Sequence, residues 1–241
     1  MILYDAVFIS DLHLNPNEPR LSERFFTFID WAREHVRAVY ILGDFFHVWP
    51  GDEALDDWSL SIANALASLV AQGIAVYFMP GNRDFLLGPQ FIQHARVTWI
   101  QEPFIFDPCG ARALLVHGDG YCTKDWSHQL LRGLTRRDRF IAWFLSLPYA
   151  LRYRLVHQIR QRSQQHSPKR LKKMHIVTRV MLKHMQTHQV TTLIHGHIHR
   201  PGLTIHSVGG VDFKQYVLSD WDDNPLYLVY NKTTGFNYFR G

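Results

Sequence analysis

The chain alternates short apolar runs with amphipathic stretches, and this alternation restricts its fold more than any other feature. Runs rich in Val, Ile, Leu and aromatic residues occur at 2–10, 39–43, 74–80 and 113–117. Segments 23–36 and 57–72 carry apolar residues at spacings of three and four, as amphipathic helices do. This order predicts an α/β protein. The first run contains Asp5 and lacks a basic leader, so we interpret it as a strand and not as a signal peptide.

The length and composition predict a single domain spanning 1–241. The chain has 241 residues, of which 46% are hydrophobic and 20% charged, enough for a full core. Residues 125–188 are rich in helical patterns and lack a good strand, so we predict a helical insertion there. Strand-like runs then resume at 191–195, 203–208, 215–218, 226–230 and 236–239. Turn signals between the last runs predict an antiparallel C-terminal meander.

Polar residues follow the predicted strands at the point where each strand ends. The stretches are Asp11-Leu-His13, Gly43-Asp44, Gly81-Asn82, His117-Gly-Asp119 and Ile194-His-Gly-His-Ile-His199. Because the carboxyl ends of parallel strands meet at one edge of a sheet, we expect these side chains to converge. Imidazole, carboxylate and amide groups without a thiolate suit paired Mn²⁺ or Fe²⁺ sites, or Zn²⁺ at lower coordination. Two ions about 3.5–4 Å apart would activate a water and clamp a phosphoryl oxygen. Asp44 is the natural bridging ligand.

Each of these residues alone has an ordinary structural explanation. An aspartate after a strand is usually a helix cap, and a buried histidine usually satisfies a hydrogen bond in the core. Only the series of five strand ends favours a metal site. An extended strand would send His195, His197 and His199 to one side, whereas Gly196 also allows a bend.

The motifs resemble those of a known family. The stretches DLH, GDFFHVW, GNRD, HGD and GHIHRP, between Asp11 and Pro201, resemble the motif series of the calcineurin-like metallophosphoesterases. GNRDFLLG and IHGHIHRP are similar to signature stretches of the UDP-2,3-diacylglucosamine pyrophosphatases (hydrolases) of lipid A biosynthesis. The resemblance implies a four-layer α/β/β/α sandwich with a helical lid and two Mn²⁺ ions per chain. It implies that one ion is bound by Asp11, His13, Asp44 and His197, and the other by Asp44, Asn82, His117 and His195.

The same resemblance implies a substrate. Hydrolysis of the pyrophosphate of UDP-2,3-diacylglucosamine would give UMP and 2,3-diacylglucosamine 1-phosphate, at the cytoplasmic face of the inner membrane and by a peripherally bound protein. The implied catalytic residues are Asn82, Arg83 and His117. The implied substrate contacts are Asn82, Arg83, Asp125, Ser163, Lys169 and His195. Many relatives have histidine where this chain has Arg83, and we hypothesise that the planar guanidinium meets the pyrophosphate.

The predicted insertion combines an apolar run with arginines. Residues 140–151 are almost continuously apolar and have Arg136, Arg137 and Arg139 before them and Arg152 and Arg154 after them. The net charge of 132–173 is +11, against −6 for the rest of the chain. The run is shorter than the about 20 residues that span a bilayer. It is either a buried helix pair or a lid whose apolar face receives acyl chains while its arginines meet phosphates or anionic headgroups.

Other functions fit the sequence less well. Another phosphoesterase of this fold, such as a nucleotide phosphodiesterase or a nuclease, is the nearest alternative. A nuclease would carry basic residues along a nucleic-acid backbone together with stacking aromatics. Here the basic residues flank an apolar run, so we expect no nucleic-acid partner. A non-catalytic scaffold would have lost ligands, whereas all seven positions carry competent side chains.

Overall fold

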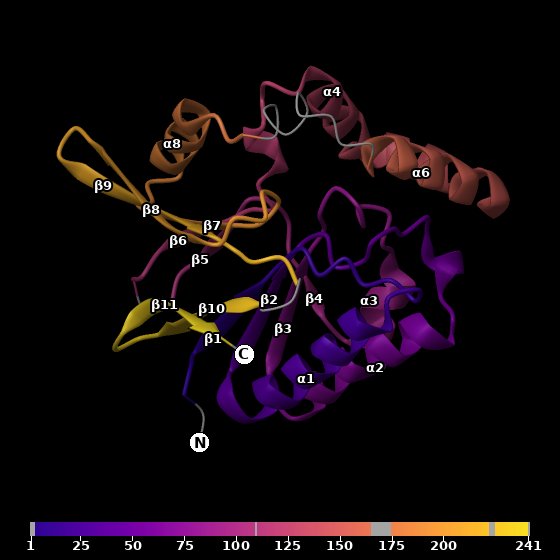
Figure 1. The fold of residues 1–241 in the computed structure, drawn as a ribbon, viewed down its shortest axis with the longest axis horizontal. Helices are drawn as coiled ribbons and strands as arrows, with labels where there is room; N and C mark the ends of the chain where they lie inside the picture. The colour runs from indigo at the N-terminus through magenta and orange to yellow at the C-terminus, as the bar shows by residue number, and fades with distance from the viewer. Residues whose placement is uncertain (1–2, 109, 165–174, 222–224, 241) are drawn as a thin grey trace.

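Two β-sheets form the centre of the computed structural model, which describes residues 3–108, 110–164, 175–221 and 225–240 (Figure 1). The strand order is β11-β10-β1-β2-β3-β4 in the first sheet and β5-β6-β7-β9-β8 in the second. The bounds of the strands are β1 (Ala6–Ile9), β2 (Ala38–Leu42), β3 (Ala75–Met79), β4 (Thr98–Trp99), β5 (Phe104–Phe106), β6 (Ala113–Leu115), β7 (Thr192–His195), β8 (Gly202–Val208), β9 (Val211–Val217), β10 (Leu226–Asn231) and β11 (Gly235–Arg240).

The central strands of both sheets are parallel. In the first sheet β1, β2 and β3 are parallel neighbours, and in the second β6, β7 and β9 are. Strands β1 and β6 are buried along their whole length, because both faces of each sheet are covered. The predicted α/β class is confirmed.

Helices cover the outer face of each sheet. Helices α1 (Pro19–His35), α2 (Asp57–Ala71) and α3 (Pro89–Ala95) share a core with the first sheet that includes Ile41, Phe28 and Leu66. Helix α8 (Thr178–Thr187) packs on the second sheet, with Met181 and Met185 against Leu193. A third core lies between the two sheets. The chain is therefore an α/β/β/α sandwich, as predicted.

The C-terminal strands do not form one meander. Strands β8 and β9 are an antiparallel hairpin at the edge of the second sheet. Strands β10 and β11 form another hairpin in the first sheet, where β10 runs antiparallel to β1. The turn signal at 233–235 identified the β10–β11 hairpin correctly, whereas the signal at 224–225 lies between strands of different sheets. The choice of sheet depends on pairing with strands far away in sequence, and local turn residues carry no information about it.

The helical segment predicted as an insertion has two parts. Helices α4 (Trp126–Thr135), α5 (Asp138–Leu145) and α6 (Tyr149–Gln164) follow the short helix η2 (Asp119–Tyr121). Figure 1 shows α4 and α6 at the end of the molecule opposite α1 and α2. Helix α8, also within 125–188, instead belongs to the outer layer of the sandwich. A lid formed by α4 to α6 stays a prediction.

Candidate metal centre

Five loops bring polar side chains to one edge of the sandwich. Asp11 and His13 follow β1, Asp44 follows β2 and Asn82 follows β3, and these three strands are parallel neighbours. His117 follows β6, and the histidines after Gly196 follow β7, the parallel neighbour of β6. The carboxyl ends of both sheets therefore supply the site, as the sequence predicts.

The backbone of these loops is shaped for the site. Of the seven non-glycine residues with positive φ in the described chain, five lie here, with φ between 49° and 70°: Asp11, His13, Asp44, His197 and His199. A left-handed conformation is unfavourable for such residues and occurs where the surrounding structure enforces it. These loops therefore tolerate strain that directs the side chains to a common point.

The first cluster contains Asp11, His13 and His199. Nε2 of His199 lies 3.4 Å from both Oδ1 of Asp11 and Nε2 of His13. Oδ1 of Asp11 and Nδ1 of His13 are buried and have no hydrogen-bond partner among the described residues. One ligand atom from each of the three residues lies within 4.8 Å of the other two. Buried polar atoms without partners are costly, so the cluster fits a cation held between them.

The second cluster contains Asp44, His117 and His197. Nε2 of His117 lies 2.9 Å from Oδ1 of Asn82 and 3.5 Å from Oδ1 of Asp44. Nδ1 of His117 bonds to the carbonyl of Leu42 at 2.9 Å, which orients the ring and leaves Nε2 for the cluster. The ligand atoms of Asp44, His117 and His197 again lie within 4.8 Å of one another.

The structure groups the histidines differently from the assignment made from the sequence. His195 belongs to neither cluster: its Nδ1 lies 2.7 Å from the carbonyl oxygen of Gly196 and its Nε2 lies 2.9 Å from the side-chain nitrogen of Gln215. His197 joins Asp44 and His117, and His199 joins Asp11 and His13. The physical reason is that β7 ends at His195 and the chain bends at Gly196, so the ring of His195 stays in the core. The motif G-H-x-H begins at Gly196, and this spacing could have identified His197 and His199.

The buried carboxylates of the site are stabilised by positive charge close to them. Burial disfavours ionisation of Asp44, but His117 and Arg83 outweigh it and hold its pKa below the usual value. Burial likewise disfavours the charged form of His117, but Asp44 and Asp11 raise its pKa to about 9. Divalent cations would satisfy the same carboxylates with a larger charge.

Glycines allow the loops to approach closely. A Cβ at Gly81 would lie 2.2 Å from Oδ1 of Asp44, and its φ is not in the left-handed region. Gly81 is thus needed because the two loops approach closely, and not because of its backbone conformation. Next to it, Asp84 accepts hydrogen bonds from the backbone N–H groups of Gly81 and Phe45, both at 2.6 Å, and so joins two ligand loops. Burial and the nearby Asp44 raise the pKa of Asp84 to about 6.

Arg83 lies directly beside the second cluster. Its Nε is 3.2 Å from Oδ2 of Asp44, and its backbone N–H donates to Oδ1 of Asp44 at 2.9 Å. Its Nη1 lies 3.3 Å from Nδ1 of His47. The guanidinium is therefore placed next to the metal ligands, where a phosphate bound at the centre would meet it. Contact with a diphosphate stays a prediction.

An apolar cavity of about 290 Å³ adjoins the clusters. The loop after β3 contributes Asn82 and Arg83 to its lining, and α4 contributes His128. Helices α4 to α6 also contribute apolar side chains: Leu131, Phe140, Phe144, Val156 and Ile159. Within the apolar run, Phe144 is 8% exposed whereas Trp143 is 55% exposed. A fully buried helix pair does not describe this segment, because it both lines a cavity and presents large apolar groups to solvent.

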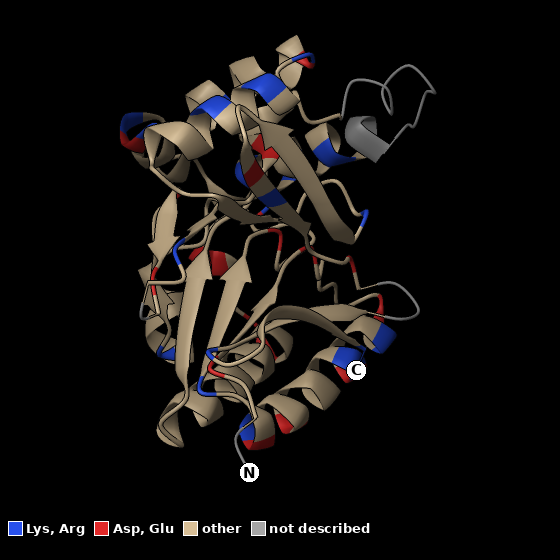
Figure 2. Cartoon of the chain, turned by 90° about the vertical axis from the view of Figure 1, so that its left-hand side faces the viewer, with Lys and Arg blue, Asp and Glu red and all other residues tan. Residues whose placement is uncertain are grey.

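Two arginines of this segment are committed to contacts within the protein. Arg152 is 1% exposed, donates to the carbonyls of Pro50 and Leu147, and forms an ion pair with Glu53. Arg136 donates to the carbonyl of Pro80. Arg152 therefore cannot meet headgroups, contrary to the sequence interpretation, because its guanidinium anchors α6 to the loop after β2. Figure 2 shows further cationic residues along these helices, and Arg137, Arg139 and Arg154 are exposed.

The predicted substrate contacts outside the loops are Asp125, Ser163 and Lys169, and the structure describes the side chain of Asp125 alone among them. Asp125 is buried and caps α4, accepting from the backbone N–H of His128 and the hydroxyl of Ser127. Ser163 is on the last turn of α6, and its side chain is outside the described part. Lys169 lies outside the described residues. These contacts remain predictions.

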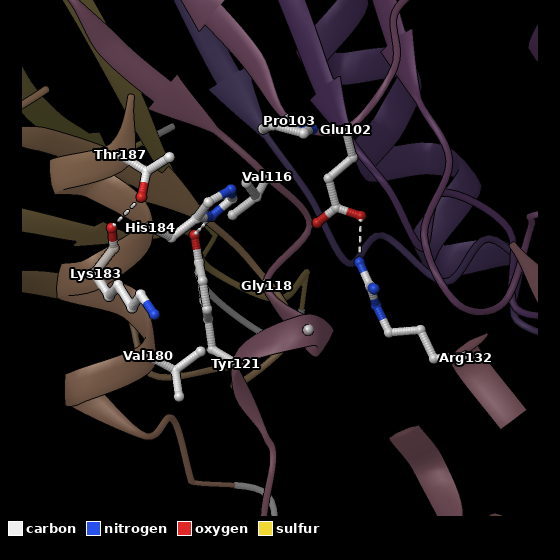
Figure 3. Close-up of a pocket in the computed structure, with 11 residues that line it drawn as sticks. Glu102, Pro103, Val116, Gly118, Tyr121, Arg132, Val180, Lys183, His184 and Thr187 are labelled. Atoms are coloured by element: carbon white, nitrogen blue, oxygen red, sulfur yellow. Dashed lines mark hydrogen bonds and ion pairs between the residues drawn. The ribbon is translucent and has the colours of Figure 1, made fainter. Parts of the chain in front are cut away.

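A separate cavity of about 470 Å³ lies between η2 and α8 (Figure 3). Its polar groups largely satisfy one another: the hydroxyl of Tyr121 lies 2.8 Å from Nδ1 of His184, and Arg132 pairs with Glu102 at 3.0 Å. Arg132 also lies 3.1 Å from Asp119. These pairs connect α8 and α4 to the loop after β6, so we interpret them as structural contacts.

Three residues near the clusters were given no role in the site by the sequence analysis. His199 is a member of the first cluster, and Asp220 lies 3.3 Å from Nδ1 of His199, on the side away from Asp11. The ring of His128 lies 5.7 Å from that of His197. The G-H-x-H spacing pointed to His199, whereas no sequence signal marks Asp220 or His128.

Comparisons with known proteins agree on a family. Residues 5–201 match the family model described as calcineurin-like phosphoesterase. The chain is 39% identical over 217 residues to a Pseudomonas putida protein named UDP-2,3-diacylglucosamine hydrolase, covering 89% of this chain and 90% of the relative. Proteins of the same name from Pseudomonas aeruginosa and Aromatoleum aromaticum are each 37% identical, with 90% and 92% of this chain covered and 91% of each relative.

Solved structures are more distant. An archaeal phosphodiesterase aligns with 98% of this chain and 99% of its own length at 12% identity, with a TM-score of 0.48. A nuclease from Pseudomonas putida aligns at 11% identity and a TM-score of 0.39, covering 98% of this chain and 87% of its own. Likenesses at this level carry no argument about activity.

Proposed function

Because this chain belongs to the calcineurin-like phosphoesterases, we propose that it is a metal-dependent hydrolase that cleaves the diphosphate of UDP-2,3-diacylglucosamine. The products would be UMP and 2,3-diacylglucosamine 1-phosphate, in a step of lipid A biosynthesis. Support comes from three relatives at 37–39% identity that carry the name UDP-2,3-diacylglucosamine hydrolase and align over about nine tenths of both chains. The observation that carries most weight is the pair of ligand clusters, one partly and one fully buried, beside an apolar cavity.

The donor set fits two divalent ions. We assign Asp11, His13, Asp44 and His199 to one ion, and Asp44, Asn82, His117 and His197 to the other. The unpartnered Oδ1 of Asp11 and Nδ1 of His13 support this assignment. Oxygen and imidazole donors without thiolate suit Mn²⁺, which is the ion we propose. Such a pair, when bound, supplies an activated water and draws electron density from the phosphoryl group.

The side chains around the centre have separate tasks in this proposal. Leu42 fixes the ring of His117 through its carbonyl, and Asp84 holds two ligand loops together. Arg83 supplies a permanent cation beside Asp44, where it would bind an oxygen of the diphosphate. The leaving sugar phosphate is weakly basic, so charge stabilisation suffices and no proton donor is required at this position.

The lipid half of the substrate would enter the apolar cavity. Phe140, Phe144 and Ile159 line it, and Arg83 and Asn82 connect it to the clusters. Among the described helices, none is long and apolar enough to cross a membrane. We propose that the protein binds the cytoplasmic face of the inner membrane peripherally through α4 to α6, whose exposed side chains include Trp126, Leu130 and Trp143.

The test is turnover of the lipid substrate. Chelator-treated protein should lose hydrolysis of UDP-2,3-diacylglucosamine, and Mn²⁺ should restore it with release of UMP. Two equivalents of metal per chain should accompany full activity. Activity that survives complete removal of metal would contradict the mechanism. Restored cleavage of a generic phosphodiester without cleavage of the lipid would favour the alternative, another phosphodiesterase of this family.

A further inference from the structure

A second groove borders the metal centre on the other side of α6. It encloses about 500 Å³ between α6, the loop after His13 and the loop after Asp44. His47 lines this groove. The ring of His47 lies 6.4 Å from that of His13, and its Nδ1 lies 3.3 Å from Nη1 of Arg83. His47 therefore connects the groove to His13 of the first cluster and to Arg83.

Helix α6 separates the groove from the apolar cavity. Val156 and Ile159 face the cavity, whereas Tyr149, Tyr153 and His157 face the groove. Arg160 lines both spaces. A substrate with two dissimilar halves joined by a diphosphate could thus place one half on each side of α6, with the diphosphate at the centre between them.

Aromatic rings form a row along the groove. Tyr149, Tyr153 and His157 follow one another at intervals of four residues, which places them on one face of the helix. The rings of Tyr149 and Tyr153 are 6.1 Å apart, and those of Tyr153 and His157 are stacked at 3.9 Å. Tyr153 is 47% exposed. Exposed aromatic faces of this kind stack on nucleobases.

The remaining lining selects a polar, uncharged ring. Asn15, Asn17 and Gln161 offer amide donors and acceptors along the groove. The carboxylates of Glu18 and Asp56 outnumber the guanidinium of Arg160 in this lining, so the groove does not favour a polyanion. Apolar residues line part of the groove as well, but an acyl chain would leave the amides without partners and would be disfavoured. The pyrimidine of uridine, with two carbonyls and one N–H, fits such a lining.

We propose that this groove binds the nucleoside of the substrate, with the uracil ring stacked on Tyr153 and the phosphates directed past His47 toward Arg83. This inference rests on the proposed function, because it assumes a nucleotide as one half of the substrate. It adds a binding site for that half, on the face of α6 next to the one that lines the acyl cavity.

The test measures binding of UMP and of inorganic phosphate to the metal-loaded full chain by calorimetry. Tyr153→Ala should weaken UMP binding by about tenfold, because stacking on one ring is lost, whereas Tyr153→Phe should stay within about twofold of the parent. Phosphate binding should be the same in all variants. Gln158→Ala, exposed on the same helix and lining neither the groove nor the apolar cavity, is the matched control and should leave UMP binding unchanged.

Three results separate the inference from the proposed function. Unchanged UMP binding in Tyr153→Ala would overturn the groove assignment even if the protein hydrolyses the lipid. Equal losses for UMP and phosphate would also overturn it, because the effect would then act on the metal centre. Tyr153-dependent UMP binding in a protein that fails to hydrolyse UDP-2,3-diacylglucosamine would support the groove and reject the proposed lipid substrate.

Discussion

At the scale of single residues, the proposed assignment of His199 as a metal ligand, in place of His195, has a measurable consequence. His199→Ala should lower the metal content from two ions per chain to about one, and activity by at least about a hundredfold, since even partners that only orient a ligand are worth 10–100-fold. Metal analysis of the purified, folded variant checks this.

The matched variant is His195→Asn. It should keep both ions and instead lose about 1–3 kcal/mol of unfolding free energy, because the hydrogen bonds to Gln215 and Gly196 are broken in the core. Loss of an ion in His195→Asn, with two retained in His199→Ala, would restore the assignment made from the sequence.

Arg83 gives a second prediction at this scale. Its guanidinium touches Asp44 through Nε and His47 through Nη1, a fork that a lysine ammonium cannot reproduce. Arg83→Lys should therefore reduce kcat/KM by about tenfold to a hundredfold, the equivalent of losing one charge-assisted contact. Steady-state kinetics on the lipid substrate measure it. A lysine variant as active as the parent would show that charge alone is sufficient.

The sequence identified residues of the site well where a motif named them directly. Asp11, His13, Asp44 and His117 carry consecutive motifs, and the structure brings them together. The two clusters contain His197 and His199, two positions later than the pair that the resemblance implied, and the sequence did not show that β7 ends at His195. The sequence also did not show the constraint on Gly81, where a Cβ would lie 2.2 Å from the Asp44 side chain, because this is a contact between distant loops.

At the scale of elements, the position of α6 depends on a single buried arginine. Arg152 joins α6 to the carbonyl of Pro50 and to Glu53, and a Cβ at Gly51 would lie 2.1 Å from its Nη1. Arg152→Ala should loosen α5 and α6, leaving the carbonyls unpaired at a cost of about 1–3 kcal/mol. Faster cleavage within 138–164 in limited proteolysis and a higher KM for the lipid would result.

Arg154 provides the control for this experiment. It is exposed and two residues away on the same helix. Arg154→Ala should leave proteolysis unchanged. Equal protection of α6 in the Arg152→Ala and Arg154→Ala variants would mean that packing of the helices on one another, and not this anchor, sets their position.

The periodicity of the sequence predicted some strands and helices better than others. The runs 39–43 and 74–80 became β2 and β3 because strands buried on both faces are continuously apolar. The C-terminal strand-like runs were recognised, but their distribution between two sheets was not, since β10 pairs with β1 more than 200 residues away. Helix α8 was grouped with α4 to α6 because amphipathicity does not reveal which sheet a helix covers.

At the scale of the whole molecule, the exposed apolar side chains of α4 and α5 predict where a membrane would be bound. Trp126 is 84% exposed, Leu130 76% and Trp143 55%, in a layer that also carries the exposed Arg137 and Arg139. Figure 2 shows these cationic helices at the end of the molecule opposite the N-terminus. Apolar groups that enter an interface beside cations bind anionic bilayers more strongly than neutral ones.

The double variant Trp126→Ser/Trp143→Ser should lower partitioning onto phosphatidylglycerol-containing vesicles by about tenfold, since each buried large side chain contributes about 1.5–3 kcal/mol and an interface buries it only in part. Sedimentation with vesicles measures the bound fraction. Ile205→Ser, on β8 at the edge of the second sheet, removes an apolar group that is 51% exposed and should change nothing. Equal losses for the two variants would show that binding follows total exposed apolar area, and the helical layer would then have no special part in reaching the lipid.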